Sequence, residues 1–393
     1  MRPLPLVFAS GVLVHGAYDA VRVLVSYKVL NLGGGAAEVG LIAGTFALVP
    51  LLLALRIGRW VDGHGSWGVM VAGGGISLAA CAGILVSPNL LVLGLANALL
   101  GLGQVMTFLA GQGVIMENSP PGKFVNGFAL FALSVSVGQS LGTPLVGALV
   151  ELRRRPGGPV DVDLAMTAMV IAVAVAVPLM LLLPRRKGGS IGAKAGTIDL
   201  LRVKGMPAAV YASLVVLTGI DLVTAYLPVV GEAHGIAPFT VTLLVAARSI
   251  FSMVSRAGMP LLMRIGGERA LLVGALAVST PAIWAVAFTG DVLALALLMA
   301  VVGFCWGMSQ PLSMNWVAML ADPTLRASAL SLRLTGNRLG QVAVPLFAGA
   351  LSGVFGPGAV FITSGVLTGT AALTTIRSHN HDPGESSDSP HES

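Results

Sequence analysis

Charged residues are scarce in this sequence, and their scarcity excludes an ordinary water-soluble protein. Only 10% of the 393 residues are Asp, Glu, Lys or Arg, 55% are hydrophobic, and the mean hydropathy is +0.88. A soluble domain carries about 25% charged residues. Most of the chain is therefore expected to face lipid or other apolar segments rather than water.

Cysteine is nearly absent, and so are the motifs of catalysis. The two cysteines, Cys81 and Cys305, lie in apolar stretches and offer neither a disulfide framework nor metal-ligand spacing. We find no His-Glu-x-x-His, no Gly-x-Ser-x-Gly with partners, no phosphate loop and no dinucleotide fingerprint. We therefore expect no metal, no cofactor and no enzyme. A channel is disfavoured because channels usually rely on symmetric oligomers or filter loops.

Long apolar segments recur along the whole chain. A membrane-spanning helix needs about 20 mostly apolar residues, and these runs are too long and too uniformly apolar for barrel strands, which alternate. The sequence predicts an all-α membrane protein with twelve transmembrane helices. The predicted spans are 6–28, 38–57, 68–87, 90–115, 126–150, 164–183, 206–230, 239–263, 271–289, 292–318, 328–352 and 359–377.

The basic residues that produce the net charge of +6 lie in short loops rather than on one face, which argues against nucleic acid as a partner. Most of them fall on one side if the amino-terminus is cytoplasmic, and Lys28 and 153–155 are the exceptions. The first apolar run lacks a small-residue cleavage site and is expected to be a retained helix. We expect a multi-pass monomer in the lipid bilayer of the inner (plasma) membrane with both termini cytoplasmic.

The chain divides near its middle into two related halves. The basic, Gly-rich segment 184–205 separates six spans on each side. It defines an amino-terminal six-helix bundle over 1–183, a cytoplasmic linker over 184–205 and a carboxy-terminal bundle over 206–378. Residues 379–393 are rich in Ser, Asp, Glu and His and are expected to form a disordered cytoplasmic tail.

Matching residues recur in the two halves at a nearly constant separation. Asp19 and Asp221 are 202 residues apart, and the same separation relates Gly101 to Gly303. Gly138-Gln139 recurs as Gly340-Gln341, Arg56 and Gly58 recur 200 residues later, and the segment after Pro144 resembles that after Pro345. Paired six-helix repeats place a substrate site near the midplane between them.

The loop Gly58–Trp67 resembles the signature loop of the major facilitator superfamily. Gly58, Asp62 and Gly65 match that signature, whereas positions where basic residues are usual hold Gly63, Ser66 and Trp67. The resemblance implies that Asp62 lies near the start of helix 11, where the positive end of the helix dipole favours a carboxylate, and that it latches the two halves on the inner side. The alternative is a solvated turn residue.

Two further segments bear on the direction of transport that this resemblance implies. Asn97 stands where proton-coupled drug exporters have Arg before the Gly101-Leu102-Gly103 segment, which weakens an assignment to drug export. The Gly/Pro-rich segment 138–147 looks like that of exporters, with Thr143 between Gly142 and Pro144. The resemblance therefore implies a secondary active transporter of a small organic solute, with proton-coupled efflux by antiport favoured and proton-coupled uptake of a small organic anion or nutrient as the alternative.

Ionisable residues inside apolar spans are costly and are candidates for function. They fall on spans that line the cavity in the family's plan: His15, Asp19 and Arg22 in the first, Asp221 in the seventh, Arg248 in the eighth, and Arg333, Asn337 and Arg338 in the eleventh. Asp19 and Asp221 are the candidates for proton coupling, because burial in an apolar cavity favours a carboxylate that loads and releases a proton.

The buried arginines are candidates for binding the substrate, because a guanidinium binds carboxylate, phosphate or sulfate groups with paired donors. Four arginines against two aspartates leave a surplus of two positive charges, which favours an anionic or zwitterionic substrate. The alternative is that these charges only pair with one another, for example Asp19 with Arg22. Neutral residues that could orient a substrate are Gln104, Gln112, Gln310 and Asn315, with Trp306 and Trp316 as a stacking wall or as packing.

Overall fold

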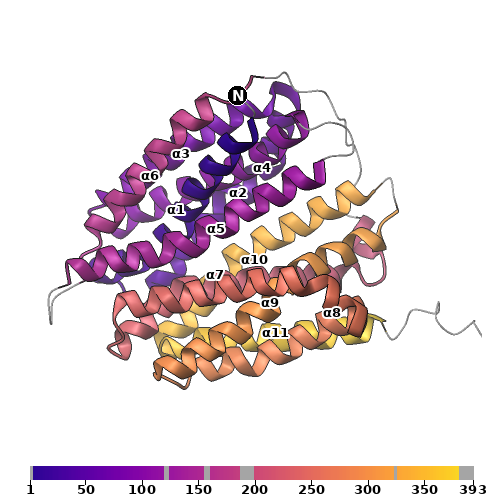
Figure 1. The fold of residues 1–393 in the computed structure, drawn as a ribbon. Helices are drawn as coiled ribbons and strands as arrows, with labels where there is room; N and C mark the ends of the chain where they lie inside the picture. Colours follow the sequence, from indigo (N-terminus) through magenta and orange to yellow (C-terminus); the bar gives the residue numbers. More distant parts are fainter. Residues whose placement is uncertain (1–2, 119–123, 155–159, 186–198, 323–324, 380–393) are drawn as a thin grey trace, which may run out of the picture.

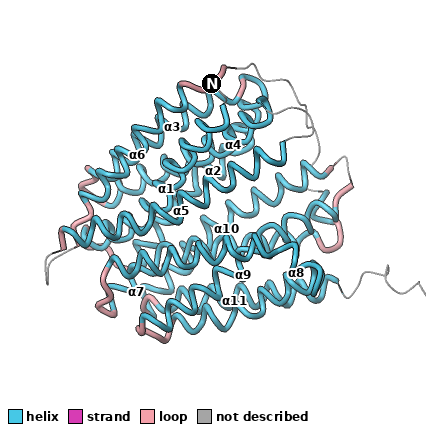
Figure 2. The backbone as a smooth tube through the Cα atoms, viewed as in Figure 1, coloured by secondary structure: helices cyan, strands magenta, loops and turns pink. Residues whose placement is uncertain are grey.

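The structure is a computed structural model that describes residues 3–118, 124–154, 160–185, 199–322 and 325–379. In these ranges the regular structure is helical (Figures 1 and 2). The helices are α1 (Pro3–Asn31), α2 (Ala36–His64), α3 (Ser66–Leu85), α4 (Leu90–Asn118), α5 (Phe124–Leu152), α6 (Asp163–Leu181), the short 3₁₀ helix η1 (Asp199–Arg202), α7 (Met206–Ala233), α8 (Pro238–Val286), α9 (Val292–Leu320), α10 (Arg326–Phe355) and α11 (Gly358–His379).

Eleven helices of the described part are long and apolar enough to cross a membrane, whereas the sequence predicts twelve spans. The difference lies in α8, whose 49 residues contain the predicted span 239–263 and most of the predicted span 271–289. A straight helix of that length would measure about 74 Å at 1.5 Å per residue, against a hydrocarbon core of about 30 Å. Gly267 interrupts α8 with φ 69° and ψ 166°, a conformation open to glycine, so a single residue replaces the loop that we expected.

The helices form two groups that follow the order of the chain (Figure 1). Within the first group α1 packs against α5 and α6, and α3 packs against α4 and α6; within the second, α8 packs against α9 and α11, and α7 against α10 and α11. The groups meet mainly through α2 on α10 and α5 on α8. Residues 186–198 and 380–393 lie outside the described part, so the boundaries of the linker and of the tail remain predictions.

The internal repeat of the sequence is visible in how the helices pack. Gly16 of α1 lies against Gly138 of α5, and the positions 202 residues later, Thr218 and Gly340, pack against each other in the same way. In both pairs the helices approach so closely that a Cβ on the glycine would clash with the neighbouring helix. Small residues permit such close crossings in membrane proteins.

A second duplicated contact involves the glycines of the fourth and tenth predicted spans. Gly101 of α4 lies directly against the backbone carbonyl of Phe46 in α2, and Gly303 of α9 lies against the carbonyl of Arg248 in α8. Phe46 and Arg248 are themselves 202 residues apart. The two halves therefore share a framework of glycine contacts, while the side chains at equivalent positions differ.

The two groups of helices are sealed together at the end of the molecule remote from residue 3, where α1 ends and α2 begins. There Gly40 of α2 faces Gly349 of α10, and a Cβ built on Gly40 would lie 2.7 Å from the Gly349 Cα. The hydroxyl of Tyr226 in α7 donates to the Ala36 carbonyl at 2.7 Å, joining the two groups by a hydrogen bond. On the other flank of this sealed end, Gly147 of α5 packs against α8.

Candidate functional site

An ion pair joins the two groups of helices at the centre of the molecule. The guanidinium of Arg22 in α1 lies 2.7 Å from the carboxylate of Asp221 in α7, and the two side chains are 12% and 8% exposed. The sequence left open a pair between Arg22 and Asp19 in the same helix. Arg22 instead pairs across the two groups, so this contact joins α1 to α7.

The second oxygen of Asp221 is also engaged. Nε2 of Gln341 in α10 donates to Oδ2 of Asp221 at 2.5 Å, and Nη1 of Arg338 donates to the Gln341 Oε1 at 3.0 Å. The resulting chain of contacts runs from Arg22 through Asp221 and Gln341 to Arg338. It links α1, α7 and α10, and each oxygen of Asp221 has its own donor.

Asp19 lies beside this chain without an ion pair of its own. Its side chain is 7% exposed, and among the described residues no basic side chain lies within 4 Å of its carboxylate. Arg22, Arg248 and Asp221 surround it electrostatically, and Gln139 of α5 is its hydrogen-bonding neighbour.

Asp19 with Gln139 and Asp221 with Gln341 are the same pair, repeated 202 residues later. Each half therefore supplies one buried carboxylate and one amide to the centre.

Arg248 is a buried cation with an unused donor. The residue is 4% exposed, one terminal nitrogen donates to Ser249 Oγ at 3.2 Å, and its Nε has no acceptor among the described residues. The charges of Asp19 and Asp221 act on it from the facing helices. An unsatisfied buried donor is costly, so this geometry favours an additional acceptor at the centre.

The central cluster, defined as Asp19, Arg22, Asp221, Arg248 and Arg338, has three basic and two acidic side chains. Its members act on one another electrostatically across α1, α7, α8 and α10. With both carboxylates ionised it has one surplus positive charge. The sequence count of two included Arg333, which instead donates to Gln310 Oε1 at 2.8 Å and to the Gln310 carbonyl at 3.3 Å.

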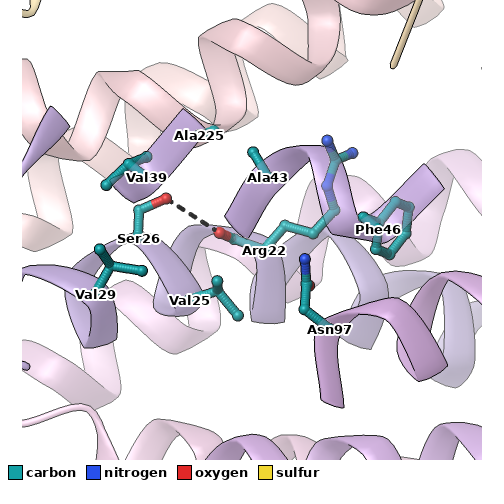
Figure 3. Close-up of a pocket in the computed structure, with 9 residues that line it drawn as sticks. All are labelled: Arg22, Val25, Ser26, Val29, Val39, Ala43, Phe46, Asn97 and Ala225. Atoms are coloured by element: carbon teal, nitrogen blue, oxygen red, sulfur yellow. Dashed lines mark hydrogen bonds between the residues drawn. The ribbon is translucent and has the colours of Figure 1, made fainter. Parts of the chain in front are cut away.

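A small cavity opens beside Arg22 toward the sealed end (Figure 3). The guanidinium of Arg22 lies 4.8 Å from the centre of the Phe46 ring, which forms one wall, and the Arg22 carbonyl accepts a hydrogen bond from Ser26. The cavity has a volume of about 10 Å³, close to the minimum that holds one water molecule. Asn97 also lines it and donates to the Ile42 carbonyl at 2.8 Å, so this residue has a packing role at the α2–α4 crossing.

His15 occupies an aromatic cluster one turn from Asp19. Its ring meets those of Tyr18, Phe108 and Phe131 edge-on, with centroids 5.6, 6.0 and 5.7 Å away. His15 and Tyr18 are buried, whereas Phe108 is 37% exposed. The structure therefore places His15 behind Phe108 rather than in contact with the charged groups.

The remaining predicted candidates are dispersed. Asn315 is exposed and donates to both carboxylate oxygens of Glu268 at 2.8 Å, outside the central cluster. Trp306 is buried with its ring against Gly219, which is a packing position rather than a stacking wall. Gln104 and Gln112 are partly buried on α4, Trp316 is partly buried on α9, and Asn337 is buried on α10 beside Arg338.

The predicted gating loop is only partly visible. Gly58 and the side chain of Asp62 lie outside what the structure describes in this loop, so the expected position of Asp62 stays a prediction. Gly65 joins α2 to α3 with φ 86°, and Glu117 of α4 accepts hydrogen bonds from the Ser66 amide at 2.9 Å and hydroxyl at 2.6 Å. Glu117 thus caps the first turn of α3.

The sequence-based site list omitted four residues that the structure places at the centre or at the seal. Gln139 and Gln341 recur beside Gly138 and Gly340 in the internal repeat, and that recurrence is the sequence signal that identifies them. Phe46 and Tyr226 gave no signal, because a single aromatic residue in an apolar span is usually packing.

Comparison with known families identifies the architecture. The family model described as Major Facilitator Superfamily matches residues 7–279 and 209–392. The chain belongs to the major facilitator superfamily. Membership places it among transporters rather than enzymes. No curated protein matches this superfamily member in sequence.

Solved structures resemble this superfamily member over nearly its whole length. The nucleoside transporter NupG is 13% identical with a TM-score of 0.80, covering 97% of this chain and 100% of its own. A bacterial homologue of the human lysosomal transporter Spinster, inward-facing and occupied, is 16% identical with a TM-score of 0.76 and 96% coverage of each chain. The human organic anion transporter MFSD10 is 16% identical with a TM-score of 0.65, covering 95% and 99%. At these identities the likeness shows the fold alone.

Proposed function

We propose that this protein is a proton-coupled secondary transporter that moves a small organic solute by alternating access. The observation that carries the proposal is the buried Arg22–Asp221 pair, which joins the two groups of helices beside a second buried carboxylate, Asp19. Ionisable groups at this depth are expensive, and they gather where the two repeats of such a transporter bind solute.

Asp19 is the better placed of the two candidates for the proton carrier. Both oxygens of Asp221 are engaged, one by the guanidinium of Arg22 and the other by the amide of Gln341. Asp19 has an amide neighbour, Gln139, and no basic group within salt-bridge distance among the described residues. Protonation of Asp19 therefore disrupts fewer contacts. Asp221 becomes available to bind a proton when its ion pair with Arg22 opens.

The proposed cycle uses two six-helix bundles, 1–183 and 206–378, that rock about the central cluster. Twelve crossings result if the two arms of α8 on either side of Gly267 each span the bilayer. We place the protein as a monomer in the inner membrane with both termini cytoplasmic, which puts the sealed end outside. Asp62 then serves as the latch at the opposite, inner side.

The direction of transport has two candidates. The exporter-like segment 138–147 favours efflux by antiport, but Gly138 and Gly142 both pack closely on Gly16, and this packing accounts for the glycines without reference to direction. The surplus of buried arginines instead favours uptake of a small organic anion. NupG and MFSD10 carry nucleosides and organic anions according to their names, so relatives of this fold accept polar solutes.

The test compares wild-type protein with Asp19→Asn in proteoliposomes under an imposed pH gradient. The solute panel comes from metabolite pools that change in cells lacking the protein. We expect Asp19→Asn to abolish uphill transport and to spare solute exchange, because exchange needs no net proton movement. The control is Asp163→Asn, an exposed carboxylate at the start of α6. Full uphill transport by Asp19→Asn would exclude Asp19 as the proton carrier.

A further inference from the structure

We propose that the Asp221 carboxylate occupies the place of an anionic group of the transported solute. A carboxylate, phosphate or sulfate group of the solute would replace Asp221 on Arg22 and be held by Arg22, Arg248 and Arg338. This assignment rests on the proposed transport function and names its substrate class, an organic anion, together with the site that binds it.

The first argument is the asymmetry of the arginines. The acid–amide pairs are duplicated, since Asp19 and Gln139 return as Asp221 and Gln341. The arginines are not duplicated. The positions 202 residues from Arg22, Arg248 and Arg338 hold Thr224, Phe46 and Ser136. The repeated residues serve a framework common to both halves, whereas three cations added at unrelated positions converge on one point.

The second argument is unmet hydrogen-bonding and charge capacity. Three guanidinium groups face two carboxylates in the central cluster, and the buried Nε of Arg248 has no acceptor among the described residues. A planar guanidinium binds an oxyanion through two parallel donors. Arg22 already holds a carboxylate, that of Asp221, at 2.7 Å, so a suitable anion can take over this contact and supply the missing negative charge.

The third argument is the lack of room. The cavity beside Arg22 admits about one water molecule, so no organic solute fits there unless a protein group leaves. Asp221 is the group that obstructs Arg22. Asp221 does not line this cavity, but its release frees the Arg22 donors that an incoming anion needs.

The sign of the coupling follows from this competition. Asp221 faces Asp19 and Arg22 on α1, Arg248 on α8, and Arg338 with neutral Gln341 on α10. A protonated Asp221 no longer competes for Arg22, so proton binding and anion binding strengthen each other, as linkage requires. The proton and the anion then travel in the same direction, and one proton with one monovalent anion leaves the charge of the central cluster unchanged.

The test measures binding, not transport, in the purified full-length protein. The probes are inorganic phosphate, benzoate and phenyl phosphate, with neutral benzamide and cationic benzamidine as matched controls. The proteins are wild type, Asp221→Asn and the control Asp163→Asn, compared at about pH 8, where a free aspartate is ionised. We expect at least one anion to bind saturably, with a Kd at least tenfold lower in Asp221→Asn than in the other two, equivalent to ~1.4 kcal/mol.

A second measurement guards against an unstable variant. Arg22→Gln should lose anion binding, because that variant lacks the guanidinium proposed to hold the anion in place of Asp221. The inference is overturned if none of the three anions binds, if only benzamide or benzamidine binds, or if Asp221→Asn binds anions no more tightly than wild type. Each of those results leaves proton-coupled transport of a neutral or cationic solute intact, whereas loss of all uphill transport by wild type would remove the proposed function itself.

Discussion

Substitution of Gly40 by alanine tests whether the sealed end sets the conformational equilibrium. A Cβ at this position would lie 2.7 Å from the Gly349 Cα and 2.5 Å from the Tyr226 hydroxyl. Carbon atoms prefer separations of about 3.5–4.0 Å, so α2 and α10 must separate by about 1 Å. Overpacking of this kind costs about 1–3 kcal/mol. The same energy shifts a two-state equilibrium by about 5- to 150-fold, here away from the sealed state.

A cysteine at Ala37 reports that shift, because Ala37 lies against Gly353 within the seal. We expect a membrane-impermeant maleimide to label Ala37→Cys several-fold faster when Gly40→Ala is also present. The native cysteines are 0% and 6% exposed and should stay unlabelled, which controls for unfolding. Gly75→Ala is the matched substitution, since no atom lies within 4 Å of a Cβ there. Equal labelling rates with Gly40→Ala and Gly75→Ala would refute the reasoning.

Two smaller changes test single contacts. Tyr226→Phe removes the hydrogen bond to Ala36, which is worth about 1 kcal/mol, and should increase labelling of Ala37→Cys at the sealed end about fivefold. The control is Tyr211→Phe, which loses a similar hydrogen bond within one group of helices and should leave the labelling rate unchanged. An equal effect of both would show that the seal is not involved. Asn97→Ala should lower the thermal stability of the purified protein by about 1 kcal/mol through loss of its bonds to α2, and an unchanged melting temperature would contradict that packing role.

The sequence predicted the helical membrane architecture because hydrocarbon imposes a length and a composition that can be counted. At α8 the structure differs from the prediction only in what connects the two predicted spans. Gly266-Gly267-Glu268 looks like a loop, yet one residue with a positive φ, Gly267, joins the two helical arms directly. The sequence pattern does not distinguish a kink at a single glycine from a glycine-rich loop between two helices.

The sequence predicted which residues form the candidate site, but not which of them contact one another. Burial cost singled out a larger set, of which the structure brings Asp19, Arg22, Asp221, Arg248 and Arg338 together. His15 and Arg333 belong to the same predicted set but have other partners. Their partners depend on the relative rotation of distant helices, which no spacing within one helix encodes. For that reason the choice of Asp221 rather than Asp19 as the partner of Arg22 required coordinates.

The seal between α2 and α10 is made largely of glycine faces and backbone, through Gly40–Gly44 and Gly349–Gly353. Glycine has no rotamers to lose, so closing this surface costs almost no side-chain entropy. An interface of long side chains would have to order and disorder them on every cycle. Two smooth faces can instead part and rejoin at little cost, which suits the opening of this end in the proposed transport cycle.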